Sequence, residues 1–158
     1  INITAVNDNP VLSGTSTIAY SENSAATLIN TGIVLSDVDT AALSNAKVSI
    51  SNYVSGEDVL SFTSNANTGN IVASFNTTTG VLTLSSPNNS GTPAQFQAAL
   101  RAVSYANTSD NPSTVARDIT FVADDGGSAN NLSSVVHSTI NITAVNDNPV
   151  LSGTTTIA

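Results

Sequence analysis

Residues 1–15 read INITAVNDNPVLSGT, and residues 140–154 read INITAVNDNPVLSGT again. The match continues to the last residue with one difference, Ser16 against Thr155. The two copies begin at residues 1 and 140, which are 139 residues apart, and self-similarity at a fixed period is typical of tandem arrays. The chain is therefore interpreted as one repeat with the opening of the next, and we expect its function to depend on how repeats join.

This period predicts how the chain divides into units. Residues 1–6 are expected to be the tail of a preceding repeat, residues 7–148 one complete repeat with its linkers, and residues 149–158 the start of a following repeat. A unit of this length is sufficient for a single domain with a substantial core. The two terminal segments are expected to be poorly restrained, because the strands that would pair with them are missing.

Composition and charge exclude several classes of protein. Cysteine is absent, so no disulfide framework can form, and stability has to come from packing, sheet ladders or bound ions. Lys and Arg total 3 against 11 Asp and Glu, which gives a net charge of −8. Nucleic acid requires a basic surface, so we expect no nucleic-acid partner. The apolar runs are too short for a membrane-spanning helix, so we expect no membrane insertion.

Short apolar runs at even spacing, separated by turn residues, predict a succession of β-strands. One helix is expected over 93–100, because Thr92 offers an N-cap and Pro93 suits the first helical position. The pattern predicts an all-β fold, namely an antiparallel Greek-key β-sandwich with one short α-helix. The expected strands cover residues 15–20, 28–35, 46–53, 59–62, 71–75, 81–84, 101–106, 117–123 and 136–145.

The acidic residues other than Asp118 lie in loop-like motifs between these runs. Successive antiparallel strands alternate in direction, so counting strands assigns each loop to one end of the sandwich. The N-linker end is predicted to gather Asn7, Asp8, Asn9, Asp37, Asp39, Asp124 and Asp125. The C-linker end is predicted to gather Glu22, Glu57, Asp58, Asp110, Asn146, Asp147 and Asn148.

Both sets offer carboxylate, carboxamide and carbonyl oxygens, without His or Cys, and such donors select hard cations. Several carboxylates in a flexible shell favour Ca²⁺ over Mg²⁺, so both sets are predicted to bind Ca²⁺. Ordinary turn chemistry is the alternative, because Asn-Asp-Asn-Pro is a good turn sequence, and it stays open above all for Glu57, Asp58 and Asp110. No enzymatic activity is expected, since His137 is the only histidine and aromatic residues make up 4% of the chain.

These motifs resemble the cadherin repeat, and more closely the cadherin-like tandem repeats of large, type I secreted (RTX-type) bacterial surface adhesins. Cadherins carry a DxNDN linker, a Glu ending the first strand, a DxD after the second strand, and an Asp one strand before the next linker. The corresponding residues here are Asn7-Asp8-Asn9, Glu22, Asp37 with Asp39, and Ala123-Asp124-Asp125-Gly126.

Two departures from the cadherin pattern favour the bacterial repeats. Ala5 stands where cadherins often have the first linker Asp, and Leu84-Ser85-Ser86-Pro87 replaces the acidic LDRE motif. The segment AQFQAALRAVSYANTSDNPST, residues 94–114, is typical of the bacterial repeats.

The resemblance implies a cadherin- or immunoglobulin-like sandwich with Ca²⁺-stiffened joints, in the extender region of an adhesin on the bacterial cell surface. The implied partners are identical or near-identical neighbouring repeats in the same chain, and an isolated fragment is expected to be monomeric. The alternative is a carbohydrate- or surface-binding module built on the same sandwich, which would need an exposed aromatic or hydrogen-bonding face.

Overall fold

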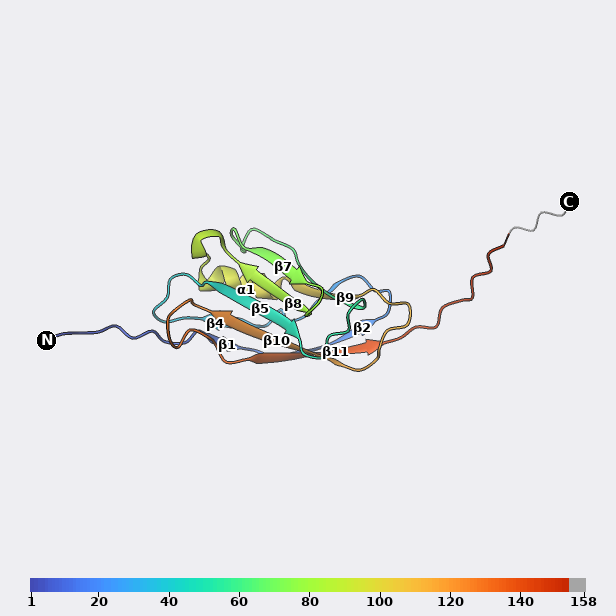
Figure 1. Ribbon diagram of the computed structural model, residues 1–158, viewed down its shortest axis with the longest axis horizontal. Coiled ribbons are helices and arrows are strands. Elements are labelled where there is room, and N and C mark those ends of the chain that lie inside the picture. Colours follow the sequence, from blue (N-terminus) through green and yellow to red (C-terminus); the bar gives the residue numbers. More distant parts are fainter. Residues whose placement is uncertain (154–158) are drawn as a thin grey trace.

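The structure is a computed structural model that describes residues 1–153. Its elements are β1 (Val11–Ser13), β2 (Ser16–Ser21), β3 (Thr27–Leu28), β4 (Val34–Ser36), β5 (Asn45–Ile50), β6 (Asp58–Phe62), β7 (Val72–Asn76), β8 (Val81–Ser85), a 3-10 turn (Pro87–Asn89), α1 (Pro93–Arg101), β9 (Val103–Asn107), β10 (Arg117–Asp124) and β11 (Val136–Thr143). Residues 1–10 and 144–153 contain no strand, and the two segments leave the fold at opposite ends (Figure 1). Residues 154–158 of the expected following repeat lie outside the described residues.

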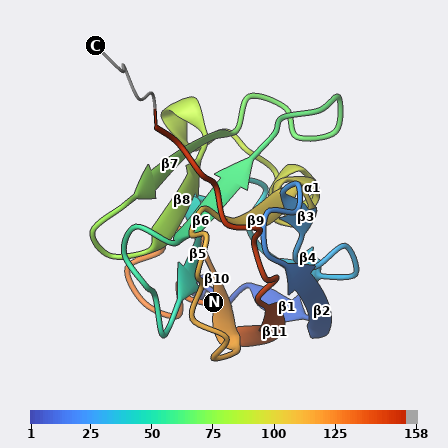
Figure 2. The ribbon, with the colours of Figure 1, turned by 90° about the vertical axis from the view of Figure 1, so that its right-hand side faces the viewer.

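The strands form a two-layered β-sandwich with one short α-helix, as the sequence pattern predicts. Six strands make the larger sheet, in the order β2-β11-β10-β5-β8-β7. The three-stranded sheet β3-β9-β6, the pair β1-β4 and helix α1 make the other layer. Figure 2 looks at the C-linker end, where β7 and β8 lie on one side and α1 and β3 on the other.

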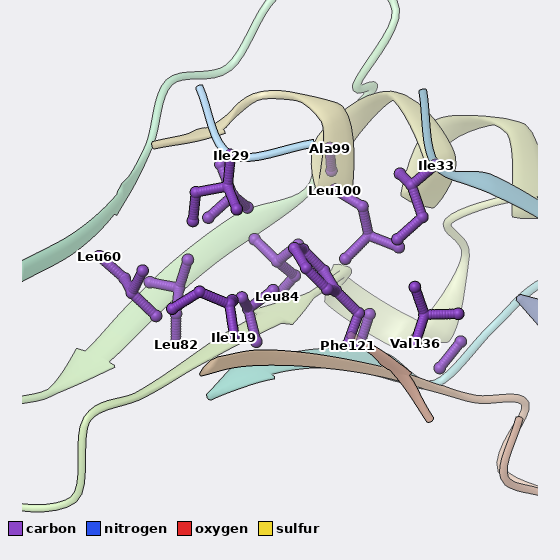
Figure 3. Packing of buried hydrophobic residues seen from close by; sticks show 14 of the residues in the cluster. Ile29, Ile33, Leu60, Leu82, Leu84, Ala99, Leu100, Ile119, Phe121 and Val136 are labelled. Atoms are coloured by element: carbon purple, nitrogen blue, oxygen red, sulfur yellow. The ribbon is translucent and has the colours of Figure 1, made fainter. Parts of the chain in front are cut away.

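The core is the contact between these two layers. Figure 3 shows Ile29, Ala99 and Leu100 above the larger sheet, facing Ile119 and Phe121. All five side chains are buried. The helix begins as predicted, with a capping box between Thr92 and Gln95 and Pro93 in its first turn.

The direction of each strand also agrees with the strand count. Asn45 pairs with both Asp124 and Ser85, so the start of β5 and the ends of β10 and β8 lie at the same end of the sandwich. Asp58 pairs with Asn107, which places the start of β6 and the end of β9 together. The loops are therefore distributed between the two ends as predicted.

One pair of strands departs from the antiparallel expectation. Strand β2 runs parallel to β11, from Ser16 beside Ser138 to Ser21 beside Thr143. Strand β1 pairs with β4, and the chain then crosses to the larger sheet, where it continues as β2. The crossing occurs at Gly14, whose φ of +95° favours glycine. This parallel pairing brings Glu22 next to the end of β11, where its amide donates to the carbonyl of Thr143 at 2.9 Å.

The single strand expected over 28–35 is wrong, because this segment forms β3 and β4 in different sheets. The buried side chain of Asn30 causes the break. Its Nδ2 donates to the carbonyl of Gly14 at 2.9 Å and to Oγ of Ser138 at 3.1 Å, and its Oδ1 accepts from the amide of Gly32 at 3.1 Å. A turn stabilised by Asn replaces the ladder at this point. No helix among residues 1–153 has the length and apolar character needed to cross a membrane.

Candidate metal centres

Three predicted residues meet at the C-linker end, and each comes from a different segment. Glu22 follows β2, Asp110 lies in the loop between β9 and β10, and Asp147 belongs to the second linker. One carboxylate oxygen from each residue lies within 4.8 Å of the other two. Within residues 1–153 this is the one group of three or more potential metal-ligating side chains at such spacing.

Glu22 has an unsatisfied oxygen in this cluster. Its side chain is buried, with the residue 4% exposed, and its Oε2 accepts from the amide of Val145 at 2.7 Å. Its Oε1 is buried without any hydrogen-bond partner among the described residues. A buried acceptor without a partner is costly, and three close carboxylates repel one another. A bound hard cation would relieve both penalties, so these residues fit a Ca²⁺ site.

The residues predicted at the N-linker end are also brought together, by direct hydrogen bonds. Asn7 donates from Nδ2 to Oδ2 of Asp125 at 2.8 Å, and Asn130 donates back to the carbonyl of Asn7 at 3.0 Å. The amide of Asp8 donates to Oδ2 of Asp39 at 3.1 Å. Asn9 donates to the carbonyl of Leu132 at 2.6 Å. The first linker is thus fastened to this domain by its own polar groups.

Asp37 and Asp124 lie at this end and mostly serve turns. Oδ1 of Asp37 accepts from the amides of Asp39 and Thr40, whereas its Oδ2 is buried without a partner among the described residues. Asp124 accepts from the amide of Gly126 at 2.8 Å and from Asn45 at 3.3 Å. Ca²⁺ binding at the N-linker end stays a prediction, for which the free oxygen of Asp37 is the main structural support.

Glu57 and Asp58, two further predicted ligands, lie at the C-linker end, where both carboxylates accept hydrogen bonds from Arg117. Their role as metal ligands stays a prediction. Nε of Arg117 donates to both oxygens of Asp58, at 3.0 and 2.8 Å, and Nη2 donates to Oε2 of Glu57 at 3.1 Å. The side chains of Arg117 and Asp58 are fully buried. Asp58 also accepts from the hydroxyl of Tyr105 at 2.6 Å and from Asn107 at 3.3 Å. Its oxygens are therefore satisfied by protein donors.

Burial is the largest cause that raises the pKa of Tyr105 above its usual range, and its hydrogen bond to Asp58 adds to the effect. This network of Asp58, Arg117, Tyr105 and Asn107 was not anticipated from the sequence. A signal was present, because Arg117 shares its side of the strand with Ile119 and Phe121 and so points into the core.

The remaining predicted ligands lie in the second linker. The Nδ2 of Asn146 donates to the carbonyl of its neighbour Asp147 at 3.2 Å, and Asn148 is exposed. Within residues 1–153, neither carboxamide makes a hydrogen bond to the folded domain. Their role as ligands stays a prediction.

His137 lies on the exposed face of β11, and its Nδ1 lies 2.9 Å from Asp118. The hydroxyl of Ser51 donates to the same carboxylate at 3.1 Å. Asp118 thus stands between the serine and the histidine. The order differs from that of a catalytic triad, in which histidine stands between the nucleophile and the acid.

No protein-family model matches the sequence, and no curated protein matches it. Similar solved structures include the seventh ScaB type I cohesin from Pseudobacteroides cellulosolvens, with 10% identity, a TM-score of 0.41, and coverage of 92% of this chain and 97% of the cohesin.

A type I cohesin–dockerin complex from Clostridium thermocellum is similar to the same degree. It shows 11% identity and a TM-score of 0.41, with coverage of 90% of this chain and 100% of the matched chain. Scores this low support no functional conclusion. The β-sandwich fold is established by the pairing of the strands themselves.

Proposed function

We propose that this chain is a non-enzymatic, calcium-binding extender repeat of a large adhesin on the bacterial cell surface, similar to cadherin-like repeats of the RTX type. The observation that carries the proposal is the cluster of Glu22, Asp110 and Asp147, with the unpartnered buried Oε1 of Glu22. Two of these carboxylates belong to the folded domain and one to the linker. A cation held among them would fasten the linker to the domain.

The mechanism is electrostatic. Within 4.8 Å of one another, the three carboxylates repel when no cation is bound, and the repulsion pushes Asp147 away from the domain. When Ca²⁺ is bound, the same three side chains attract one charge, and the linker is held against Glu22 and Asp110. The joint then changes from a hinge to a rigid connection.

The repeated sequence supports the idea that the linker contacts both of its neighbours. Residues 140–154 are identical to residues 1–15, so Asp147 corresponds to Asp8. At the second linker, the carboxylate of Asp147 faces the preceding domain through Glu22. At the first linker, the backbone amide of Asp8 donates to Asp39 of the following domain. One aspartate can thus serve both domains at once, and the partners of this repeat are neighbouring near-identical repeats.

The expected affinity fits an extracellular location. Extracellular calcium modules typically bind with dissociation constants of about 10⁻⁴–10⁻³ M. Such sites fill at the millimolar Ca²⁺ outside cells and stay empty in cytosol. The joints would therefore become rigid only after export.

The alternative of a carbohydrate- or surface-binding module has less support, because the tyrosines have structural roles. Tyr20 and Tyr105 pack edge to face in the core, with ring centroids 5.1 Å apart. Tyr53 packs against Phe75 and lies so close to Gly80 that a Cβ added at this glycine would clash with the tyrosine ring. None of the three tyrosines offers an exposed aromatic platform.

Thermal melts of the 158-residue chain in CaCl₂, in EGTA and in MgCl₂ test the proposal. Saturation at about 100 times the dissociation constant stabilises a folded state by about 2.7 kcal/mol. For a domain of this size, that corresponds to a rise in Tm of roughly 5–10 °C. The rise should occur with Ca²⁺ and not with Mg²⁺. Superimposable melts in CaCl₂ and EGTA would contradict the proposal.

A further inference from the structure

The Asp110 carboxylate makes no hydrogen bond of its own among the described residues, although the candidate Ca²⁺ site needs it in place. Asp110 is exposed and lies in the loop of residues 108–116, between β9 and β10. Its position therefore depends on how the backbone of this loop is held. A mobile loop would lose conformational entropy each time the site closed.

Glu57 holds this loop on both sides of Asp110. Its backbone carbonyl accepts from the amide of Thr108 at 2.8 Å. Its side-chain Oε2 accepts from the amide of Ser113 at 3.1 Å. Thr108 precedes Asp110 by two residues and Ser113 follows it by three, so a single residue closes the short span that carries the ligand.

The core in turn holds Glu57 in place. Arg117, whose side chain is fully buried, donates from Nη2 to the same Oε2 at 3.1 Å, and from Nη1 to the carbonyl of Val115 at 2.6 Å. The other side of the guanidinium is occupied by buried Asp58. The side chain of Glu57 itself is 19% exposed. A continuous set of charge-assisted hydrogen bonds therefore runs from the core to the loop.

We propose that Glu57 is a positioning residue for the Ca²⁺ site at the C-linker end, which sets the place of Asp110 through Thr108 and Ser113 and does not contact the ion. This inference rests on the proposed function, since it assumes that Glu22, Asp110 and Asp147 bind Ca²⁺. It assigns a role to a carboxylate that the sequence pattern presents as a ligand. Groups that orient a ligand in this way commonly change metal affinity by about 10–100-fold when they are removed.

The test follows the amide resonance of Val145 by NMR during a CaCl₂ titration of the 158-residue chain. This amide donates to Glu22, so its shift reports on the C-linker end specifically. In Glu57→Ala, the midpoint should move to about tenfold higher Ca²⁺ or more. In Glu57→Gln, the carboxamide oxygen can accept from the amide of Ser113 and from Nη2 of Arg117, as Oε2 of Glu57 does. The midpoint should therefore stay within about threefold of wild type. Asp118→Asn changes an exposed acid outside both predicted ligand sets and should leave the midpoint unchanged.

A wild-type midpoint in Glu57→Ala would overturn the inference and leave the calcium site itself intact. An equal loss in Glu57→Gln and Glu57→Ala would also overturn it, because the effect would then be one of charge and not of position. If Glu57→Ala does not fold, Glu57→Asp replaces it, because the shorter side chain keeps the charge near Arg117 and withdraws from Ser113. Glu57→Asp should also move the midpoint of the titration to higher Ca²⁺. A wild-type titration without any shift at Val145 would instead refute the proposed function at this site.

Discussion

The amide of Val145 donates to Oε2 of Glu22 at 2.7 Å, and this bond joins the chain leaving the last strand to the residue that follows β2. The other oxygen of the same carboxylate, Oε1, is buried and unpartnered. Glu22 thus fastens the exit of the chain with one oxygen and leaves the second free beside Asp110 and Asp147. A buried, half-satisfied carboxylate of this kind is unlike an ordinary surface acid, and the proposed calcium site is based on it.

The effect of Glu22→Gln on the stability of the fold should depend on the calcium concentration. In EGTA the substitution removes one of three repelling charges, so the variant should melt at or above the wild-type Tm. In CaCl₂ it loses a charged ligand, so most of the Ca²⁺-dependent rise should disappear. Circular dichroism melts in both buffers measure the two effects. The control is Asp118→Asn, which changes an exposed acid outside the cluster and should keep the full Ca²⁺-dependent rise in Tm. A full rise in Glu22→Gln would contradict the assignment of Glu22 as a Ca²⁺ ligand.

The ion pair between Arg117 and Asp58 should stabilise the fold whether or not Ca²⁺ is present. Arg117→Met leaves a buried carboxylate without its cation, and removal of one partner from such a pair typically costs about 3–5 kcal/mol. Urea unfolding in EGTA measures the loss.

The matched comparison for that variant is Asp118→Ala, which removes an exposed carboxylate that lies 2.9 Å from Nδ1 of His137. Exposed pairs contribute about 0–1 kcal/mol, so this variant should stay close to wild type. Equal losses in the two variants would show that the buried network has no special weight in stability.

Tyr105 should resist ionisation in alkali, because burial and the nearby Asp58 raise its pKa above the usual range. The folded-state pKa is higher than the unfolded one, so this contribution to stability is complete below pH about 10 and is lost as pH rises through the folded-state value. Difference spectroscopy of the phenolates should show a tyrosine in the folded chain that ionises at higher pH than it does in the unfolded chain. In Tyr105→Phe the late-titrating group should be absent, whereas its persistence there would assign it to another tyrosine.

A protein of two consecutive repeats should become longer and stiffer with Ca²⁺. Small-angle X-ray scattering should give a larger maximum dimension in CaCl₂ than in EGTA. Asp147→Ala at the internal joint should abolish the difference, because that carboxylate alone belongs to the linker. Asp118→Ala serves as the control. A joint that responds to Ca²⁺ equally well in both variants would place the hinge elsewhere.

Much of the fold could be predicted from local signals. The alternation in 117–123, the capping residues Thr92 and Pro93, and the turn residues between runs act within a few positions of one another. The strand count then assigned the loops to the correct ends. The division of 28–35 could not be predicted in this way, because Asn30 breaks the strand through bonds to Gly14 and Ser138, which are distant in sequence.

The sequence by itself determined the repeat, the all-β class and the two groups of oxygen donors. The tertiary structure decided which donors meet. Only the parallel pairing of β2 with β11 places Glu22 beside the second linker, close to Asp110 and Asp147. Glu57 and Asp58 read as potential ligands in the sequence, but the buried guanidinium of Arg117 attracts both carboxylates. A charge inside the core needs compensation from whatever side chains surround it, and those neighbours are set by the packing of distant strands.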